Sequence, residues 1–300
     1  MILGCQQLFT TKFLGYDPLS DASRIFTIID GNIHNPMLTA QLTSDYEIVG
    51  NFSKSYRPIY IIGEGTSSRV GSYILDGKKV ALKIQRYKNG IKEISMIRYL
   101  GSHPFIMSII GFEIMLGSPC DRVNNGTEDA IISRDNVIHI FMPIFTPLTN
   151  VMDNKLTREK KFKYIRQILV AIEYLHNKDV IHMDIKPENI LVDDNDDIKL
   201  IDFDNSVVGT ERSLRKIAGT HGFLPPEFIG KTETVFSTEV DIYSAGLTFI
   251  EIITNRQNGS LKKCGEFTQL LSLMLLEDGM SRPTAKTCIN ILDRLRRHDD

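Results

Sequence analysis

Polar residues that could bind a phosphate and a metal ion lie close together between Val180 and Phe203. They are two carboxylates, an amide and an ammonium group, from Asp184, Asp202, Asn189 and Lys186. Two short apolar runs, Ile190–Val192 and Ile198–Ile201, lie between them and predict two strands joined by an Asp/Asn-rich turn. Because a hairpin brings its ends together, we expect the four side chains at one site. Such a set suits a metal-bound phosphate better than a packed core. The acidic run Asp193–Asp197 itself is interpreted as a solvated turn.

A second group of residues suited to phosphate binding comes earlier in the chain. The segment Tyr60–Leu75 is interpreted as a strand, a glycine-containing turn and a second strand. Gly63 and Gly65 would let the backbone approach a ligand and aim N–H groups at phosphate oxygens, although glycines in strands also mark bulges. Lys83 follows Val80 and Ala81 on a third predicted strand, where a buried ammonium needs an anionic partner.

The remaining elements are expected to position these groups. Apolar residues at helical spacing predict a helix over Ile91–Leu100 that ends at Gly101. Ile106–Leu116 and Val137–Met142 are predicted as strands, with a long surface loop over residues 117–136 between them. Thr157 is predicted to cap a helix that runs to about Asn177 and leads into the polar stretch.

Composition narrows the class of protein. The 300 residues carry a net charge of −2 with a pI near 6.4, which indicates neither a nucleic-acid nor a membrane-surface partner. Four separated cysteines favour reduced thiols, hence an intracellular location in cytoplasm or nucleus. No signal peptide is apparent, and the apolar run Ile242–Ile253 is too short to span a bilayer. Residues 1–56 carry no recognisable chemistry and are interpreted as an N-terminal extension.

The segment His182–Asn189, followed by Asp202-Phe-Asp, resembles the catalytic loop and the Asp-Phe-Gly motif of the eukaryotic protein kinases. The glycine-containing turn and Lys83 resemble their glycine-rich loop and Val-Ala-x-Lys strand. This resemblance implies an α+β, bilobal fold. The kinase domain would cover residues 57–296, with a β-rich N-lobe at 57–144 and a mainly helical C-lobe at 145–296.

The resemblance also implies roles in γ-phosphoryl transfer from MgATP to a protein substrate. Asp184 would accept or orient the proton of the substrate hydroxyl, and Lys186 would reach the γ-phosphate. Asn189 and Asp202 would hold Mg²⁺. Glu93 would pair with Lys83 and hold it against the α- and β-phosphates. Ser/Thr kinases carry a lysine two residues after the catalytic aspartate, as Lys186 stands after Asp184, so Ser and Thr substrates are expected. The implied ATP-binding residues are Ile62, Gly63, Glu64, Gly65, Thr66, Ser67, Ser68, Arg69, Val70, Ala81, Lys83 and Leu191.

Further matches lie on both sides of the central stretch. Phe141 resembles the bulky residue behind the adenine, next to the hinge. The run Gly219–Glu227 resembles the end of the family's activation segment, the stretch that follows Asp202-Phe-Asp. Within it, Thr220 would contact Asp184 and Lys186, and Glu227 would pair with Arg282. Asp241 would bind the backbone of the catalytic loop. The matched residues are Phe141, Thr220, Glu227, Asp241 and Arg282.

Some positions depart from the family pattern. Ser68 replaces the third loop glycine, and Asp204 replaces the glycine after Asp202-Phe. Met183 replaces the arginine that gathers a phosphate on the activation segment, so activity is predicted not to require that phosphate. Only ten residues separate Lys83 from Glu93, which predicts a helix that is short at its start. The helix that usually follows residues 242–253 is predicted to be reduced or absent.

Two alternatives remain besides a Ser/Thr kinase. A pseudokinase would be a nucleotide-binding or scaffold module without turnover, and Met183 and Asp204 keep it open. A small-molecule phosphotransferase of the same fold is disfavoured by Lys186, Thr220 and Glu227, which would serve peptide substrates. The compact build and trimmed helices look like kinases encoded by large DNA viruses, herpesvirus-like ones included.

Overall fold

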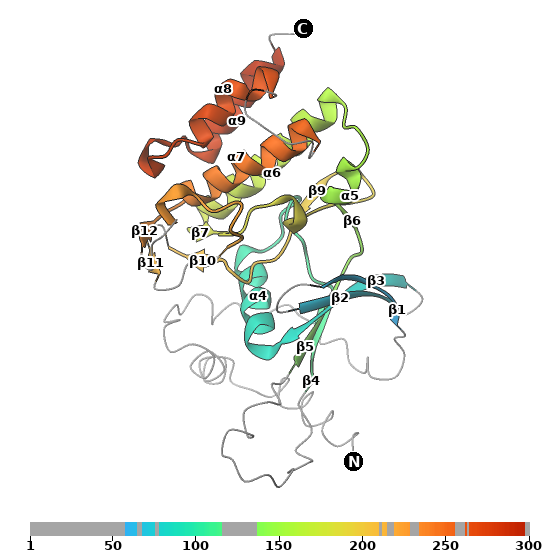
Figure 1. Cartoon of the computed structure of the whole chain (residues 1–300). Helices are drawn as coiled ribbons and strands as arrows, with labels where there is room; N and C mark the ends of the chain where they lie inside the picture. The colour runs from blue at the N-terminus through green and yellow to red at the C-terminus, as the bar shows by residue number, and fades with distance from the viewer. Residues whose placement is uncertain are drawn as a thin grey trace, which may run out of the picture. The chain divides into compact units, whose positions relative to one another are not determined.

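The computed structural model describes residues 58–64, 68–75, 78–115, 137–209, 212–214, 219–228, 234–255, 262 and 264–297. The chain divides into two compact units (Figure 1). Unit 1 contains the described residues of 1–101 and 108–144, and unit 2 contains those of 102–107 and 145–300. The predicted N-terminal extension, residues 1–56, and the predicted loop at 117–136 lie outside the described residues.

Unit 1 is built on an antiparallel sheet with the strand order β1-β2-β3-β5-β4. Its strands are β1 (Pro58–Glu64), β2 (Ser68–Leu75), β3 (Lys78–Arg86), β4 (Gly111–Met115) and β5 (Val137–Met142). Alternation along the central strand β3 separates two sets of side chains. Val80 and Leu82 pack with Phe141 in an apolar cluster, whereas Lys83 and Gln85 belong to the opposite face. Between Val80 and Gln85 the polar side chains of the central strand therefore lie on one face only.

Helix α4 (Tyr87–Leu100) follows β3 without a connecting loop, since β3 ends at Arg86. It begins four residues before the predicted Ile91. Its end is as predicted, because Gly101 adopts a φ of 72° and donates its N–H to the carbonyls of Ile97 and Arg98. The helix packs against β3 and β5.

The predicted strand over Ile106–Leu116 is only partly correct. Strand β4 covers Gly111–Met115, whereas residues 102–107 belong to unit 2. There the backbone of Phe105 and Met107 exchanges hydrogen bonds with Leu200, and Ile106 forms a parallel bridge to the same residue. Residues 105–107 pair with Leu200 inside unit 2, so the strand of unit 1 starts only at Gly111. The apolar run Ile106–Leu116 does not show this change of partner.

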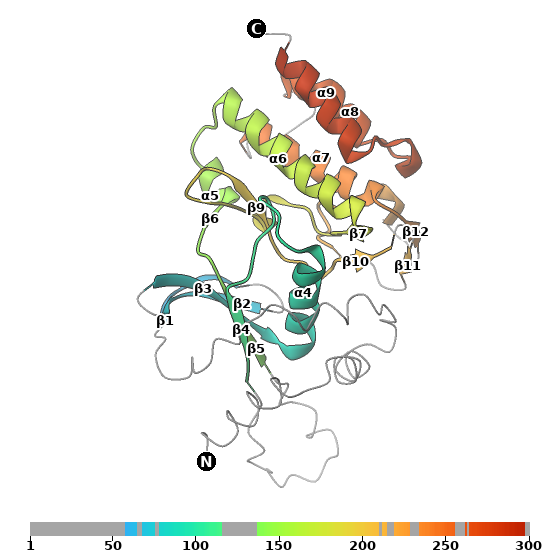
Figure 2. The same ribbon diagram turned by 180° about the vertical axis from the view of Figure 1, so that it is seen from behind.

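Unit 2 is mainly helical. Its α-helices in the described residues are α5 (Leu148–Met152), α6 (Arg158–Asn177), α7 (Glu239–Thr254), α8 (Thr268–Met274) and α9 (Ala285–Arg297). Helix α6 packs against both α7 and α9, as Figures 1 and 2 show from opposite sides. Between α7 and α9 the described residues contain only the seven-residue α8 and short 3-10 turns, in line with a reduced helix in this region.

Short strand pairs complete unit 2. Three short strands form the sheet β6-β8-β9, and four other strands form the pairs β7–β10 and β11–β12. The strands are β6 (Thr146–Pro147), β7 (Val180–Ile181), β8 (Ile190–Val192), β9 (Ile198–Leu200), β10 (Val207–Val208), β11 (Arg212–Leu214) and β12 (Thr234–Phe236).

Helix α6 begins as predicted. The Thr157 hydroxyl accepts a hydrogen bond from the backbone N–H of Lys160, and Glu159 stands in the first turn, where a negative charge is favoured. The apolar face is buried, including Phe162, Ile168 and Leu175. Helix α7 is the most apolar helix, yet among the described residues no helix is long and apolar enough to cross a membrane.

Candidate functional site

The predicted hairpin in unit 2 is confirmed. Strands β8 and β9 pair in register, with Ile190 opposite Leu200 and Val192 opposite Ile198. Just beyond the pair, the N–H of Ile201 donates to the carbonyl of Asn189 at 3.0 Å. The hairpin therefore brings the segment that ends at Asn189 beside the segment that leads to Asp202.

The acidic run at the tip of the hairpin is a turn, but it is tied to α6 rather than simply solvated. Asp196 accepts hydrogen bonds from the Tyr164 hydroxyl at 2.6 Å and from the Lys160 ammonium at 2.9 Å. Asp197 accepts one from the Gln167 amide at 2.6 Å. These contacts fix the hairpin on the helix that precedes it.

Asp184 is the centre of the polar cluster in unit 2. Its carboxylate is 5% exposed and accepts hydrogen bonds on both oxygens. Lys186 Nζ at 2.6 Å and Asn189 Nδ2 at 3.0 Å approach Oδ2, while the N–H and hydroxyl of Thr220 approach Oδ1 at 2.9 and 2.7 Å. Burial alone would raise the pKa of Asp184, but bonds from Lys186 and Thr220 and the Lys186 charge outweigh it and hold this pKa below its ordinary value.

The contact predicted between Thr220 and Lys186 is also present, with Lys186 Nζ 2.5 Å from the Thr220 hydroxyl oxygen. Thr220 follows Gly219, which has a φ of 114°. A Cβ at Gly219 would lie 2.6 Å from the carbonyl oxygen of Met183, so this close approach requires glycine. The activation segment therefore contacts the catalytic loop through both side chains and backbone.

The side chains of Asn189 and Asp202 belong to two neighbouring segments of unit 2. Asn189 lies in the 3-10 turn η4 (Pro187–Asn189) and uses its Nδ2 group to bond both Asp184 Oδ2 and the Asp184 carbonyl. Its amide oxygen is therefore turned away from Asp184 and can serve as an oxygen ligand. Asp202 has a φ of 68°, a left-handed conformation that a non-glycine residue seldom adopts.

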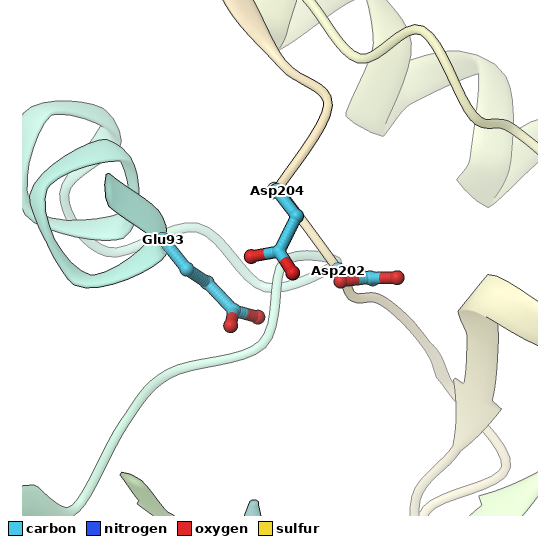
Figure 3. A group of neighbouring side chains, drawn as sticks. All are labelled: Glu93, Asp202 and Asp204. Atoms are coloured by element: carbon cyan, nitrogen blue, oxygen red, sulfur yellow. The ribbon is translucent and has the colours of Figure 1, made fainter. Parts of the chain in front are cut away.

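Asp202 and Asp204 extend from the same segment after β9, and a carboxylate oxygen of one lies within 4.8 Å of one of the other (Figure 3). Two carboxylates at this distance repel each other unless a cation lies near them. The amide oxygen of Asn189 and the carboxylates of Asp202 and Asp204 are hard oxygen donors, which Mg²⁺ prefers. The donor set of unit 2 therefore fits a divalent metal ion.

Asp241 holds the backbone of the catalytic loop, as the resemblance implied. It is fully buried at the start of α7, and its carboxylate accepts from the N–H groups of His182 and Met183 at 2.8 and 2.9 Å. His176 Nε2 lies 3.0 Å from the same carboxylate. Burial acts to raise the pKa of Asp241, but His176, His182 and the backbone N–H bonds hold it below its ordinary value.

Met183 occupies the position beside Asp184 with a φ of 71° and is 1% exposed. Its side chain belongs to an apolar cluster with Ile181, Phe228 and Val240, against which Val207 and Leu224 pack. Val207 and Leu224 belong to the activation segment. An apolar contact thus joins that segment to the catalytic loop at the place where the family pattern has an arginine.

Glu227 and Arg282 form the predicted ion pair at the end of the activation segment. The two terminal guanidinium nitrogens of Arg282 donate to the two carboxylate oxygens of Glu227 at 2.7 Å. Arg282 also donates to the carbonyls of Leu276, Glu239 and Glu277. Its guanidinium lies 4.8 Å from the centre of the Tyr243 ring, so the cation is held on several sides.

The predicted pair between Lys83 and Glu93 is present in unit 1. Lys83 Nζ lies 2.7 Å from Glu93 Oε2, and both residues are buried. A third residue that sequence reasoning missed, Gln85, donates its Nε2 amide to the same Oε2 at 2.7 Å. The signal available in the sequence was a polar amide two residues after Lys83, on the inward face of a central strand.

The predicted ATP-binding residues are distributed over both units. Val70 lies directly opposite Lys83 in the β2–β3 register, and Ala81 precedes Lys83 by two residues, so these three share one face of the sheet. Leu191 lies on β8 of unit 2 and is half-buried. The backbone of Ile62, Gly63 and Glu64 belongs to β1, and Ser68 and Arg69 to β2. The predicted loop residues Gly65, Thr66 and Ser67 lie outside the described residues.

Two cysteines, Cys264 and Cys288, fall in the described part of the chain, and both are buried. Burial raises the pKa of Cys288 to about 12 and also raises the pKa of Cys264. Both thiols therefore stay protonated at neutral pH. Cys5 and Cys120 lie outside the described residues.

Comparison with known proteins agrees with this geometry. The chain is 29% identical over 228 residues to the carbon catabolite-derepressing protein kinase of Candida glabrata, covering 71% of this chain and 33% of that protein. It is 27% identical over 229 residues to the L-type lectin-domain containing receptor kinase V.7 of Arabidopsis thaliana, covering 71% and 32%. The chain thus spans about a third of the length of these curated relatives. A family model described as the protein kinase domain matches residues 56–263, and the chain therefore belongs to the protein kinase family.

Proposed function

We propose that the chain is an active Ser/Thr protein kinase, which transfers the γ-phosphoryl group of MgATP to protein hydroxyls. The observation that carries this proposal is the cluster around Asp184. Its carboxylate is buried, ionised and held by Lys186, Asn189 and Thr220. A fixed carboxylate of this kind orients a substrate hydroxyl and accepts its proton as the phosphoryl group is transferred.

Lys186 and Thr220 support a peptide hydroxyl as the substrate. Lys186 Nζ bonds both Asp184 and the Thr220 hydroxyl, so its charge is fixed beside the proposed base. A positive charge there would stabilise the negative charge on the transferred group. Thr220 belongs to the activation segment, the part of the family fold that receives the peptide, which favours a protein over a small-molecule substrate.

ATP and Mg²⁺ are the cofactors that these side chains support. Lys83, oriented by Glu93, would bind the α- and β-phosphates, while Val70, Ala81 and Leu191 would pack on the adenine. Asn189 and Asp202 would hold Mg²⁺. When bound, the metal neutralises charge on the phosphate oxygens.

The apolar cluster around Met183 supports activity without a phosphate on the activation segment. Met183 packs in the cluster with Val207 and Leu224 of that segment, a contact that needs no charge. We expect phosphatase treatment to leave the rate unchanged. A large loss of activity after treatment would contradict this expectation.

A pseudokinase is the second candidate, and Asp204 is the observation that favours it. Its carboxylate lies within 4.8 Å of Asp202, so the two could change the charge and geometry of the metal site. In a pseudokinase the nucleotide would bind without phosphoryl transfer.

Labelled ATP, Mg²⁺ and generic protein substrates distinguish the two candidates. The wild type should transfer phosphate to Ser and Thr, and Asp184→Asn should lower kcat by about 10²- to 10⁴-fold while ATP still binds. Lys83→Met should weaken nucleotide binding as well. Nucleotide binding by the wild type without any transfer would favour the pseudokinase.

Location inside a cell, in cytoplasm or nucleus, remains a prediction from the separated cysteines. An origin in a large DNA virus remains a prediction from the trimmed helices.

A further inference from the structure

Gln85 is a buried polar residue in a place where an apolar side chain would pack well. It lies on the central strand β3, is 2% exposed, and stands opposite Ser68 on β2 and Ile138 on β5. Its Nε2 amide donates to Glu93 Oε2 at 2.7 Å. Its carbonyl oxygen Oε1 is buried without a hydrogen-bond partner among the described residues.

The orientation of this amide is set by its neighbour. The opposite orientation would place Oε1 against the Glu93 carboxylate, and two acceptors repel each other. The bonded orientation leaves Oε1 unpaired, and an unpaired buried carbonyl lowers stability. Stability alone would therefore favour an apolar residue at position 85, so the bond to Glu93 needs another explanation.

Gln85 and Lys83 converge on a single oxygen. Both donors lie 2.7 Å from Glu93 Oε2, and Glu93 extends from α4 (Figure 3). Lys83 carries a mobile ammonium on a long stem, whereas the amide of Gln85 carries no charge and has no attraction to a phosphate anion. A nucleotide that draws Lys83 toward its phosphates would leave Gln85 bonded to Glu93.

The start of α4 is also held close to Gln85. The helix begins at Tyr87, directly after the last residue of β3. A Cβ at Gly90 would lie 1.7 Å from the Ile138 side chain and 3.3 Å from Cγ of Gln85, so the first turn lies tightly against β3 and β5. With no loop between strand and helix, a bond from Gln85 to Glu93 restrains the helix at two points.

We propose that Gln85 is a positioning residue for phosphoryl transfer: it holds the Glu93 carboxylate, and with it α4, in place for Lys83. This inference rests on the proposed kinase function. Gln85 acts through Glu93 and touches neither ATP nor the reacting atoms. Its uncharged bond supplements the ion pair and persists when Lys83 engages the nucleotide.

The first test replaces Gln85 by methionine, which is similar in length and volume but cannot donate. We expect Gln85→Met to lower kcat/KM for ATP about tenfold, the range of one hydrogen bond to a charged group. The melting temperature should stay equal to that of the wild type or rise, because the unpaired carbonyl is removed. Wild-type kcat/KM, or a loss of activity that parallels a loss of stability, would overturn the proposal.

Ser95→Ala is the matched control on α4. The Ser95 hydroxyl is buried and donates to the Ile91 carbonyl within the same helix at 2.6 Å. This variant removes a buried hydrogen bond of α4 that does not involve Glu93. It should leave kcat/KM near the wild-type value, and a tenfold loss here would mean that any weakening of α4 has the same effect.

A second test measures binding of ATP rather than its turnover, by calorimetry with Mg²⁺ present. Gln85→Met should weaken ATP binding in the wild-type background but have no further effect in a Glu93→Gln background. Equal weakening in both backgrounds would assign Gln85 a general packing role. Because this cycle needs no turnover, it still tests Gln85 if the wild type binds ATP but transfers no phosphate.

A third measurement needs neither ATP nor activity. Hydrogen exchange of the α4 amides in the nucleotide-free protein should speed up in Gln85→Met and not change further in the double variant. Failure of the wild type to bind ATP would therefore count against the proposed function alone. Unchanged exchange in Gln85→Met would count against the role of Gln85 alone.

Discussion

Asp241 in unit 2 and Glu93 in unit 1 are both buried carboxylates, but different kinds of donors hold them. Asp241 is 0% exposed and accepts two backbone N–H groups, from His182 and Met183, besides His176. Glu93 is 2% exposed and accepts from two side chains, Lys83 and Gln85, on one oxygen. Backbone donors cannot leave without unfolding the loop, whereas a charged side-chain donor such as Lys83 can exchange partners.

This difference matches what each carboxylate is proposed to do. Asp241 fixes the backbone of a loop whose geometry must stay constant, so permanent donors suit it. Glu93 orients a lysine that must also bind a nucleotide, so one exchangeable donor and one constant donor suit it. Replacing individual donors and acceptors tests whether the kind of donor decides how firmly each carboxylate is held.

The largest effect on stability is expected for Asp241→Asn. The amide must direct its NH₂ group at a backbone N–H or at His176, which leaves buried donors unpaired. Breaking such a buried charged network costs about 4 kcal/mol in the free energy of unfolding. Urea unfolding measures the cost, and a loss below about 1 kcal/mol would show that backbone donors do not make this site rigid.

The loss of stability caused by Asp241→Asn should depend on pH, and the pKa of Asp241 gives the direction. The pKa of Asp241 in the folded protein lies below the ordinary value of 3.8, so its contribution to stability is fully present above that value. The contribution is lost as the pH falls through the folded pKa. The difference in unfolding free energy between wild type and Asp241→Asn should therefore be constant near neutrality and shrink below pH 3.8.

An intermediate effect is expected at Arg282, a buried cation with both kinds of partner. It meets the Glu227 side chain through two nitrogens and donates to three backbone carbonyls. Lysine keeps the charge but cannot form the paired bonds, so Arg282→Lys should cost about 3 kcal/mol. Urea unfolding of both variants under the same conditions measures the loss in the free energy of unfolding. A loss for Arg282→Lys equal to or above that for Asp241→Asn would reverse the expected order.

The sequence predicted those parts of the site that depend on local spacing. Asp184, Lys186 and Asn189 lie within six residues, and the two strands after them form a hairpin whose geometry follows from alternation and turn residues. Residues far apart in the chain, such as Asp241 and its partners at 182 and 183, were predicted only through the resemblance to kinases. Their contact depends on how α7 packs, which periodicity does not determine.

Features that depend on a particular partner were missed. Gln85 in a strand is compatible with a solvent-facing position, and only its bond to Glu93 explains its burial. The acidic turn was predicted to be solvated, because spacing does not show that Tyr164 and Gln167 of α6 reach it. Residues 105–107 look like the start of a strand of unit 1, yet they belong to unit 2, where their backbone bonds Leu200.

The smallest effects are expected at Asp196, which side chains hold near the surface. Lys160, whose side chain is 44% exposed, should contribute little, because water screens the pair and the long side chain loses freedom. Lys160→Gln is therefore expected to change the unfolding free energy by about 0.5 kcal/mol or less. Tyr164→Phe should cost more, about 1 kcal/mol, because this buried hydroxyl donates to Asp196 at 2.6 Å.

The two variants control for each other, since they remove different donors to the same Asp196 oxygen. Urea unfolding at low and high salt separates them: the small cost of Lys160→Gln should vanish in high salt, whereas that of Tyr164→Phe should persist. If the lysine variant cost more than the tyrosine variant, burial would not determine how firmly a carboxylate is held. The contrast between Asp241 and Glu93 would then have to rest on charge rather than on the kind of donor.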